Sequence, residues 1–334
     1  MEQAYNHHVS VMLDEVIEYA NLKKNSKVLD MTLGRAGHSS EFLKRILEGF
    51  LYGVDQDKEA LTFSEERLSK IGTNFKTIDS NFAEVPELLK EQNLQDFDFI
   101  FFDLGVSSPQ FDDPKRGFSY RFNAPLDMRM DQNDSSIPTA KYVVNKYDAE
   151  TLMKALYEFA DEKFAKSIVR NIIKSREQKT IETTFELVDI VKKSLPPKEL
   201  HKDGHPAKKT FLAIRYLVNS EKGAINTGIP AALDLLKVGG RLGVLTFNSY
   251  EDGLVKTIFK KATTNEVVDK YLPPIDKPIN YKLVTRKPIS PTIEEIERNN
   301  RSKPAKLRVI ERIGKWNTIS WQNKVKRKKA NFSK

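Results

Sequence analysis

At residues 27–38 the sequence reads Lys27-Val-Leu-Asp-Met-Thr-Leu-Gly-Arg-Ala-Gly-His38, the pattern of a strand followed by a glycine-containing turn and the start of a helix. The apolar run Lys27–Met31 predicts the strand, and helical spacing of apolar residues predicts a helix from about Ser39 to Leu47. Gly34 and Gly37 let the backbone of the turn approach a ligand closely, and helix N–H groups begin just after them. The stretch therefore predicts a strand–turn–helix unit with a ligand site at its turn.

The alternation of strands and helices continues along the chain. A second helix is predicted from Ala60 to Ile71, and further strands are predicted at Phe50–Asp55, Phe75–Asp79, Phe97–Asp103 and Arg241–Phe247. Two weaker strand candidates are Glu266–Tyr271 and Tyr281–Thr285, and a helix over Ala231–Lys237 is predicted to end at Gly239-Gly240. Strands rich in Val, Ile and Phe that alternate with helices predict an α/β fold, a mostly parallel sheet with both faces covered.

The pattern becomes continuously helical from about Ile137 to Ser194. Within it, Thr183-Thr-Phe-Glu186 is a capping-box signature for a helix that Pro196-Pro197 ends. We predict a helical insertion at residues 113–213 and a discontinuous α/β domain at residues 1–112 and 214–290. Residues 291–334, rich in Pro, Asn and basic side chains, are predicted to form a poorly packed basic tail.

The net charge of +9 is concentrated at the C-terminal end of the sequence. From Arg286 to Lys334 there are 15 Lys and Arg residues against 4 Glu residues, and the densest run is Lys324–Lys329. Such a run binds a polyanion such as RNA or DNA, because Lys and Arg displace its counterions, or it is a solvated tail that aids solubility. The sequence leaves both interpretations open.

Several classes of protein are excluded by what the sequence lacks. It contains no cysteine, which removes disulfides, thiolate zinc sites and cysteine nucleophiles. It has no apolar run of the roughly 20 residues that a membrane helix needs, and its N-terminus does not resemble a signal peptide. His7 and His8 are adjacent, so they point in different directions, and no metal site is expected. We expect a cytoplasmic protein with no membrane segment.

Four predicted strand ends carry polar or glycine-rich residues, and ligands of open parallel sheets bind at the carboxyl ends of strands. The turn with Gly34 and Gly37 follows the first strand, and Asp55 ends the second, where a carboxylate can accept hydrogen bonds from both ribose hydroxyls. After the third strand, Phe82 is placed to pack on a purine, and the segment Asp103–Gln110 follows the fourth. These positions predict a site for a nucleoside-containing cofactor.

A nicotinamide dinucleotide is the first alternative for this cofactor. Its loop normally reads G-x-G-x-x-G, whereas here the loop is G-x-A-G-H, and the bulk of Arg35 and His38 intrudes where a pyrophosphate would lie. S-adenosyl-L-methionine contains an adenosine but no pyrophosphate, so it fits this loop better. The glycine pair Gly239-Gly240 before the fifth strand favours the same cofactor.

Seven ordered sequence blocks carry a resemblance to a known family. They are His8–Glu15, Asp30–Ser39, Asp103–Gln110, Arg116–Ser119, Pro125–Arg129, His205–Phe211 and Ala305–Arg308. On these blocks the chain resembles the RsmH/MraW family of bacterial 16S rRNA cytosine-N4 methyltransferases, from about His8 to Arg308.

The resemblance implies a class I S-adenosylmethionine-dependent methyltransferase domain, Rossmann-like with a mostly parallel seven-stranded sheet, and a helical insertion that recognises the substrate. It implies cofactor contacts, in addition to Gly34, at Ala36, Gly37, His38, Asp55, Phe82, Asp103 and Gln110. The implied reaction is rRNA methylation on the N4 exocyclic amine of a cytidine in the decoding region. The expected partner is therefore 16S rRNA or the small ribosomal subunit, and a homodimer is left open.

One block departs from the family pattern. Where the family usually reads S-F-H-S-L-E-D-R, this chain has Thr246-Phe-Asn-Ser-Tyr-Glu-Asp-Gly253. Asn248 stands in place of a histidine and Gly253 in place of an arginine, and both are expected beside the active cleft. Asn cannot act as a base near neutral pH. If the histidine has only a positioning role, activity survives; if it helps to remove a proton, this protein is slow, altered in its target or inactive.

The cytosine amino nitrogen is a poor nucleophile, because its lone pair is delocalised into the ring. Acceptors for its hydrogens help, and we predict Asp103 and carbonyls around Ser107–Pro109 in this role, unless Asp103 only orients the cofactor. The predicted catalytic residues are Asp103, Ser108, Pro109 and Asn248. The predicted phosphate contacts are Arg116, Arg129, Lys208, Lys209 and Arg215, with Arg121 beside them and with Phe118, Tyr120 and Phe122 as stacking partners for a base. Each of these residues is otherwise a surface charge or a core aromatic.

Two further functions stay open at this point. One is a methyltransferase of the same fold that acts on DNA or another amine, and the other is an RNA- or ribosome-binding relative with weakened catalysis. Retention of Gly34, Gly37, Asp55, Asp103 and Gln110 argues against the second, because a non-catalytic relative has little reason to keep a complete cofactor pocket.

Overall fold

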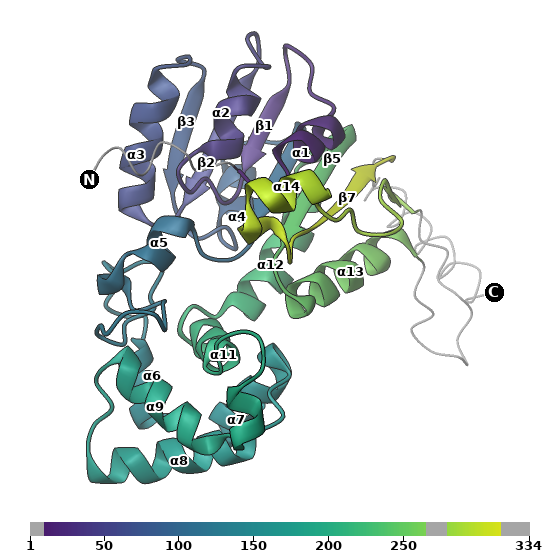
Figure 1. The fold of residues 1–334 in the computed structure, drawn as a ribbon. Coiled ribbons are helices and arrows are strands. Elements are labelled where there is room, and N and C mark those ends of the chain that lie inside the picture. Colours follow the sequence, from purple (N-terminus) through teal and green to yellow (C-terminus); the bar gives the residue numbers. More distant parts are fainter. Residues whose placement is uncertain (1–9, 265–278, 315–334) are drawn as a thin grey trace, which may run out of the picture.

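The computed structural model describes residues 10–264 and 279–314. A central sheet carries helices on both faces, and a second group of helices extends from one end of the sheet (Figure 1). None of the helices in these two ranges is both long and apolar enough to cross a membrane.

The sheet has seven strands within the described ranges. They are β1 (Lys27–Asp30), β2 (Phe50–Asp55), β3 (Phe75–Asp79), β4 (Phe97–Asp103), β5 (Leu236–Thr246), β6 (Tyr281–Leu283) and β7 (Lys306–Arg312). Their order is β3-β2-β1-β4-β5-β7-β6, and β7 alone runs antiparallel to its neighbours. Strand order reverses between β1 and β4, so the ends of these two strands form the crevice in which ligands of such sheets bind.

Helices cover the two faces of the sheet. One face packs against α1 (Leu13–Ala20), α2 (Gly37–Leu43) and α3 (Lys58–Ser69), and the other against α4 (Val85–Glu91), α12 (Glu221–Leu233) and α13 (Ser249–Thr263). Alternate residues of β4 are buried on opposite faces of the sheet. Phe99 and Phe101 pack on the face covered by α1, α2 and α3, and Ile100 and Phe102 on the face covered by α4, α12 and α13. This double burial explains the unbroken apolar run of β4.

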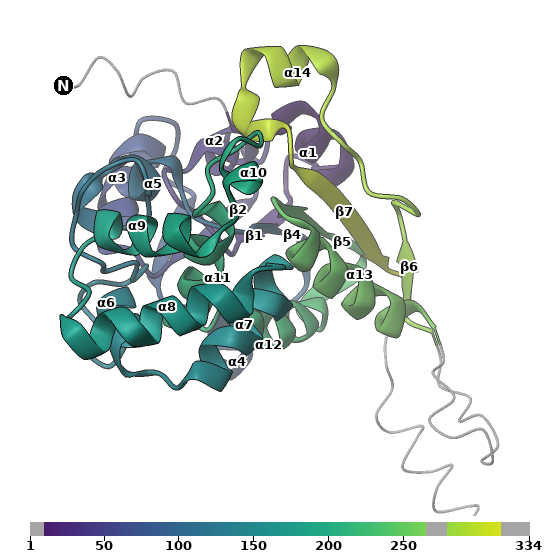
Figure 2. The same ribbon diagram turned by 60° about the horizontal axis from the view of Figure 1, so that its bottom comes forward.

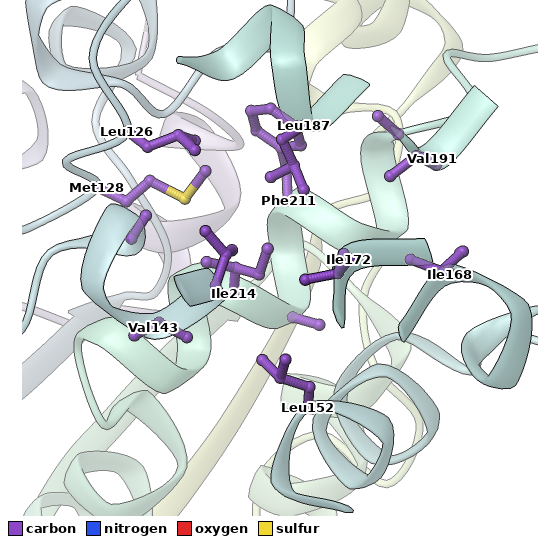
Figure 3. Packing of buried hydrophobic residues seen from close by; sticks show 14 of the residues in the cluster. Leu126, Met128, Val143, Leu152, Ile168, Ile172, Leu187, Val191, Phe211 and Ile214 are labelled. Carbon is purple, nitrogen blue, oxygen red and sulfur yellow. The ribbon is translucent and has the colours of Figure 1, made fainter. Parts of the chain in front are cut away.

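The second group of helices has its own core. It comprises α6 (Ala140–Lys146), α7 (Ala149–Ala160), α8 (Ala165–Gln178), α9 (Thr184–Ser194), α10 (Pro197–Leu200) and α11 (Lys208–Val218), and it is reached through α5 (Ser108–Asp112) and the 3-10 helix η2 (Pro114–Arg116). Figure 2 shows these helices side by side, and Leu152, Ile168, Ile172, Leu187 and Phe211 are among the side chains packed together between them (Figure 3). The predicted capping box of α9 is present: the Thr183 hydroxyl accepts from the Glu186 N–H, and the Glu186 carboxylate accepts from the Thr183 N–H.

Where the sequence predicted one continuous helical stretch, the structure has separate short helices. Asp148 and Thr183 each start a new helix as an N-cap, and the left-handed Asp161 follows α7. Polar N-caps and changes of backbone direction therefore divide this stretch into separate helices, although apolar residues recur at helical spacing along all of it. The predicted boundary between residues 213 and 214 falls inside α11, and Ile214 and Val218 beyond it still pack in the core of this helical group.

Most predicted strands are confirmed, but the helix end at Gly239-Gly240 is wrong. Helix α12 ends at Leu233, and both glycines lie inside β5. Gly239 has φ +82°, and the register of β4 and β5 shifts between Phe97 and Phe99. The glycine pair thus forms an irregularity in the strand, which glycine accommodates without a Cβ clash.

The prediction of a poorly packed tail from residue 291 is also wrong for residues 291–314. Helix α14 (Ile293–Arg298), the 3-10 helix η3 (Asn300–Ser302) and β7 follow one another there, and Leu307, Val309 and Ile310 are buried. The strand pairs with β5 over six residues, from Arg241↔Glu311 to Thr246↔Lys306. The strand candidate Glu266–Tyr271 and the basic run Lys324–Lys329 lie outside the described residues.

Candidate active site

A cavity of about 720 Å³ lies at the carboxyl ends of β1, β2, β4 and β5 and extends to α11. Its wall includes residues from all four predicted strand ends. The predicted site residues that line it are Gly34, Gly37, His38, Asp55, Phe82, Asp103, Ser108, Pro109, Gln110, Lys208, Arg215 and Asn248. The predicted site residues Ala36, Arg116, Arg129 and Lys209 are not in the cavity wall.

The glycine turn after β1 has a backbone that suits close approach to a ligand. Gly34 has φ +52°, and Ala36, the N-cap of α2, has φ +55°. A Cβ on Gly37 would collide with the Ser10 hydroxyl, so any other residue here requires that hydroxyl to move. The first turn of α2 therefore begins at the cavity with exposed backbone on its near side.

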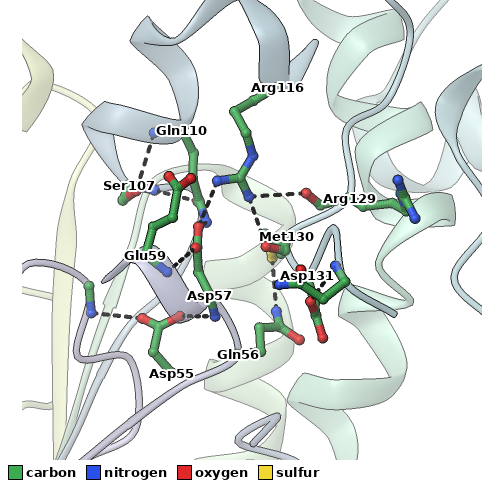
Figure 4. Close-up of polar contacts among 12 residues, drawn as sticks. Asp55, Gln56, Asp57, Glu59, Ser107, Gln110, Arg116, Arg129, Met130 and Asp131 are labelled. Atoms are coloured by element: carbon green, nitrogen blue, oxygen red, sulfur yellow. Dashed lines mark hydrogen bonds and ion pairs between the residues drawn. The ribbon is translucent and has the colours of Figure 1, made fainter. Parts of the chain in front are cut away.

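Asp55 ends β2 and is held by the turn after β1. Its Oδ2 accepts from the Gly34 N–H at 2.8 Å, and its Oδ1 accepts from the Asp57 N–H at 2.9 Å (Figure 4). Burial raises the pKa of Asp55 to about 6. Each carboxylate oxygen keeps a lone pair beyond these bonds, so the group can also accept from a diol at the cavity wall.

Asp103 ends β4 and is the most perturbed acid of the cavity. Burial, with the nearby charges of Asp30 and Glu251, raises the pKa of Asp103 to about 8. Among residues 10–264 and 279–314 its Oδ1 has no hydrogen-bond partner, and its Oδ2 lies 3.6 Å from His38 Nδ1. Since His38 Nε2 lies 3.0 Å from the Val11 carbonyl, which can only accept, Nε2 carries the proton and Nδ1 faces Asp103.

Asp30 lies beneath the glycine turn. It accepts from the Ser39 hydroxyl at 2.6 Å and from the Thr32 N–H at 3.1 Å, and burial raises its pKa to about 6. Asp30, Asp55, Asp103 and Glu251 all line the cavity, whose wall also carries Lys208 and several arginines. Carboxyl groups beside the glycine turn disfavour a pyrophosphate there and favour a ligand that carries positive charge.

The segment after β4 is tied to the helical group by a buried polar junction of Gln110, Asp57 and Arg116. Gln110 Nε2 and Arg116 Nη1 both donate to Asp57 Oδ2 at 2.8 Å (Figure 4). Gln110 Oε1 accepts from the Ser107 N–H, and Arg116 Nη2 donates to the Met130 carbonyl at 2.8 Å. The junction therefore joins the end of β2, the start of α5 and the first loop of the helical group.

Asn248 follows β5 and starts α13. Its Oδ1 accepts from the Glu251 N–H at 2.9 Å, and its Nδ2 lies 3.4 Å from the Tyr216 hydroxyl. Tyr216 donates to Glu251 Oε1 at 2.7 Å, which joins α11 of the helical group to α13 of the sheet domain. Gly253, in contrast, lies away from the cavity, and a Cβ there would meet nothing within 4 Å.

Three of the five predicted phosphate contacts are engaged with acids of the protein. Arg116 is 6% exposed and paired with Asp57, so it is a buried structural residue in this structure. Arg129 forms a two-bond pair with Asp127, and Arg215 forms one with Glu221. Sequence reasoning missed these pairings because the partners of Arg116 and Arg215 come from other elements.

The two lysines at the start of α11 are the exposed members of the predicted set. Lys208 lines the cavity, and Lys209 donates to the Asp161 carbonyl at 2.6 Å. Two further cations of the cavity wall, Arg298 and Arg301, come from the segment that was expected to be a tail. Arg301 pairs with Asp112 of α5 at 2.8 Å and thereby connects the two sides of the cavity mouth.

The predicted aromatic residues differ in their positions. Phe118 is buried in the core of the helical group, whereas Phe122 is 40% exposed. Tyr120 lines the cavity, but one face of its ring stacks on His205 with centroids 4.2 Å apart. Phe82 lines the cavity with its ring edge-to-face on Phe102.

Fold and cavity together define a class I S-adenosylmethionine-dependent methyltransferase. The family model described as the MraW methylase family matches residues 5–313, so the chain belongs to this family. It is 49% identical over 308 residues to the ribosomal RNA small subunit methyltransferase H of Mesoplasma florum, covering 91% of this chain and 99% of that protein. It is 45% identical to the protein of the same name from Limosilactobacillus fermentum, covering 92% of this chain and 98% of that one.

Similarity to solved structures is more distant. An rRNA methylase from Streptococcus thermophilus is 12% identical with a TM-score of 0.38, over 90% of this chain and 94% of that one. SMU.1697c, a putative methyltransferase from Streptococcus mutans in complex with SAH, is 13% identical with a TM-score of 0.41, over 92% of this chain and all of that one.

Proposed function

We propose that this protein transfers a methyl group from S-adenosyl-L-methionine to the N4 exocyclic amine of a cytidine in the decoding region of 16S rRNA. The relatives named as ribosomal RNA small subunit methyltransferases, which align over more than 90% of this chain, support the class of RNA. The observation that carries the choice of an amine is Asp103, a half-buried carboxyl group at the end of β4 whose Oδ1 has no hydrogen-bond partner in the part of the chain that the structure describes.

The residues present fit the cofactor. Asp55 suits the ribose hydroxyls, Phe82 the adenine, and the backbone of Gly34–Gly37 the remainder, with His38 and Gln110 supporting the wall. When bound, S-adenosylmethionine supplies a methyl group on a positively charged sulfonium. The buried acids of the cavity suit that charge, because a nearby cation favours the ionised form of a carboxyl group.

Asp103 and the start of α5 are placed to accept hydrogen bonds from an amino group. The ionised Asp103 carboxylate, part of which is exposed to the cavity, is one source of acceptors, and carbonyls around Ser107–Pro109 are the second. Acceptors on both amino hydrogens pull the nitrogen toward tetrahedral geometry and return electron density to it, while the cavity wall holds it in place. Methylation of the ring carbon requires a nucleophile that adds to the ring, a role for which cysteine is suited, and the sequence contains none.

We further propose that residues 113–213 recognise the substrate, together with the C-terminal segment. Lys208 supplies positive charge for RNA phosphates. From the other side of the cavity, Arg298 and Arg301 are ion-paired with Glu295 and Asp112 but about half exposed, so their remaining N–H groups can still contact phosphates. The target base has to be unpaired or extruded, because the cavity lies at the strand ends within the protein and a paired amine is inaccessible there.

The function is tested by incubating the purified full-length chain with labelled S-adenosylmethionine and one of three acceptors: undermethylated small subunits, naked 16S rRNA or DNA. We expect label in the small subunits or their rRNA and none in DNA. Transfer to DNA in preference to RNA, or cofactor binding without transfer to any acceptor, contradicts the proposal.

A further inference from the structure

Asn248 lies in the cavity wall at the point where β5 gives way to α13, and the orientation of its side-chain amide is fixed. Its Oδ1 accepts from the Glu251 backbone N–H at 2.9 Å, as the N-cap of α13. A backbone N–H can only donate, so the oxygen of the amide has to lie at this end and the NH₂ group at the other. The cap therefore decides which group Asn248 turns away from the helix.

A second contact holds the NH₂ group. The Tyr216 hydroxyl donates its hydrogen to Glu251 Oε1 at 2.7 Å, so its oxygen is free to accept from Asn248 Nδ2, 3.4 Å away. Glu251 is 1% exposed, and its Oε2 accepts from the Phe247 N–H at 2.7 Å. Burial and the nearby carboxylates raise the pKa of Tyr216, so the hydroxyl keeps its hydrogen over the working range of pH.

The Asn248 NH₂ group has two hydrogens. One is directed at the Tyr216 hydroxyl, and the other has no partner among residues 10–264 and 279–314. Because Asn248 is half-buried in the cavity wall, this hydrogen is a fixed donor for a ligand. We propose that Asn248 donates this hydrogen bond to the ring nitrogen N3 of the target cytosine and so determines which bases are accepted.

Asn248 and Asp103 lie in the same cavity wall, at the ends of the neighbouring strands β5 and β4. Asp103 pairs with Leu245 across β4 and β5, and Asn248 follows Leu245 by three residues. A base that spans these two strand ends meets acceptors at Asp103 and a donor at Asn248. Cytosine presents the complementary pair, an amino group beside a ring-nitrogen acceptor, whereas uracil presents a carbonyl oxygen beside an N–H donor. This inference rests on the proposed function, because it assigns a role within the same cavity.

The test is Asn248→Ser, which retains a good N-cap residue and removes the NH₂ donor. Substrate is undermethylated small subunits, and three quantities are measured: the melting temperature, the affinity for S-adenosylmethionine and kcat/KM for the subunits. We expect the melting temperature and the cofactor affinity of Asn248→Ser to equal those of the unsubstituted protein. We expect its kcat/KM to be lower by about 10- to 100-fold, because a buried acceptor on the base loses its donor.

Two matched variants separate the donor from the cap. Asn248→Ala lacks both the NH₂ donor and the capping oxygen. Its kcat/KM should fall as much as that of Asn248→Ser, and its melting temperature should be lower by about 2–4 °C because the cap is lost. Asn248→Asp keeps the shape and the capping oxygen but turns an acceptor toward N3, so we expect it to lose more kcat/KM than Ser.

Equal kcat/KM in Asn248→Ser and the unsubstituted protein overturns the inference, as does a loss explained entirely by weaker cofactor binding. Failure of the proposed function is a different result, because the unsubstituted protein itself would then transfer no methyl group to the subunits. A short RNA that carries the target cytidine or its 3-deaza analogue gives a second readout by binding. The unsubstituted protein should bind the analogue more weakly, and Asn248→Ser should bind both alike; a preference that survives the substitution contradicts the assignment.

Discussion

The protonation state of Asp103 links the cavity to pH. Burial raises the pKa of Asp103 to about 8, so the carboxyl group of the free protein is protonated at neutral pH. A cationic ligand prefers the ionised form, and binding below pH 8 therefore releases a proton. The affinity for S-adenosylmethionine should rise with pH up to about 8, by at most about tenfold per pH unit.

Calorimetric titrations between about pH 6.5 and 8.5 measure this dependence directly. In Asp103→Asn the cofactor affinity should no longer depend on pH above about pH 7. Asp30 and Asp55, whose pKa values are about 6, are already ionised there. If Asp103→Asn keeps its cofactor affinity near pH 7 and loses turnover, Asp103 is an acceptor for the amino group. Lost affinity at all pH values means instead that it serves the cofactor.

The same group affects folding with a defined sign. The pKa of Asp103 in the folded protein lies above the ordinary value of 3.8. Its favourable contribution to the free energy of unfolding is therefore complete below about pH 4 and is lost as the pH rises through about 8. Chemical denaturation of the free protein should therefore show stability falling between these values, and the fall should be smaller in Asp103→Asn. An unchanged slope in the variant means that other groups carry the pH dependence.

The role of a single residue could be predicted from the sequence only where its partners lie nearby in the sequence or where the sheet topology brings them together. Asp55 and Asp103 were found because the topology of a parallel sheet brings strand ends together. The roles of Tyr216, Glu251 and Asp57 were missed, because each depends on a contact with an element far away in the sequence. Asn248 followed by Glu251 is a capping pattern, and it was the one local signal for that part of the site.

Strand β7 shows the corresponding limit for secondary structure. The strands Phe50–Asp55 and Phe97–Asp103 were predicted with the bounds found, because both of their faces are buried or partly buried and the runs are mostly apolar. Phe75–Asp79 was also predicted with its bounds, although it is an edge strand with exposed Lys76 and Asp79. Lys306–Arg312 carries charged residues among its apolar ones, since Arg308 pairs with Asp252 and Glu311 with Arg241. A strand that forms ion pairs through Arg308 on one face and Glu311 on the other looks like a polar tail in the sequence.

Strand β7 should therefore be essential for folding. A chain that ends at residue 290 lacks β7 and exposes β5, so we expect it to be insoluble or to show no cooperative thermal unfolding. A chain that ends at residue 314 is the matched control, because it keeps β7 and lacks the basic run Lys324–Lys329. Cooperative unfolding of both chains at the same temperature would contradict the role given to β7.

The shorter control also tests the basic run. With residues 315–334 removed, cofactor affinity should be unchanged, whereas RNA affinity should fall and depend less steeply on salt, because fewer counterions are released. Filter binding of 16S rRNA over a series of salt concentrations gives both quantities. An unchanged salt slope identifies the run as a solvated tail.

At the level of the complete molecule, the junction of Asp57, Gln110 and Arg116 connects the sheet domain to the helical group. Arg116→Met leaves the Asp57 carboxylate buried without its cation, and loss of one partner of a buried pair costs about 3–5 kcal/mol. Urea denaturation should show this loss, and kcat/KM for subunits should fall more than cofactor affinity. The double variant Asp57→Asn, Arg116→Met should recover part of the stability, and a strictly additive double loss would contradict coupling through this pair.

The identity of the methylated nucleoside is the most direct test of the reaction. Small subunits treated with the protein and labelled S-adenosylmethionine are digested to nucleosides, and the product is separated and analysed by mass spectrometry. The cavity, with acceptors at Asp103 and no cysteine in the chain, predicts N4-methylcytidine as the labelled product. Label in 5-methylcytidine, or in a methylated adenosine or uridine, would contradict the proposed chemistry.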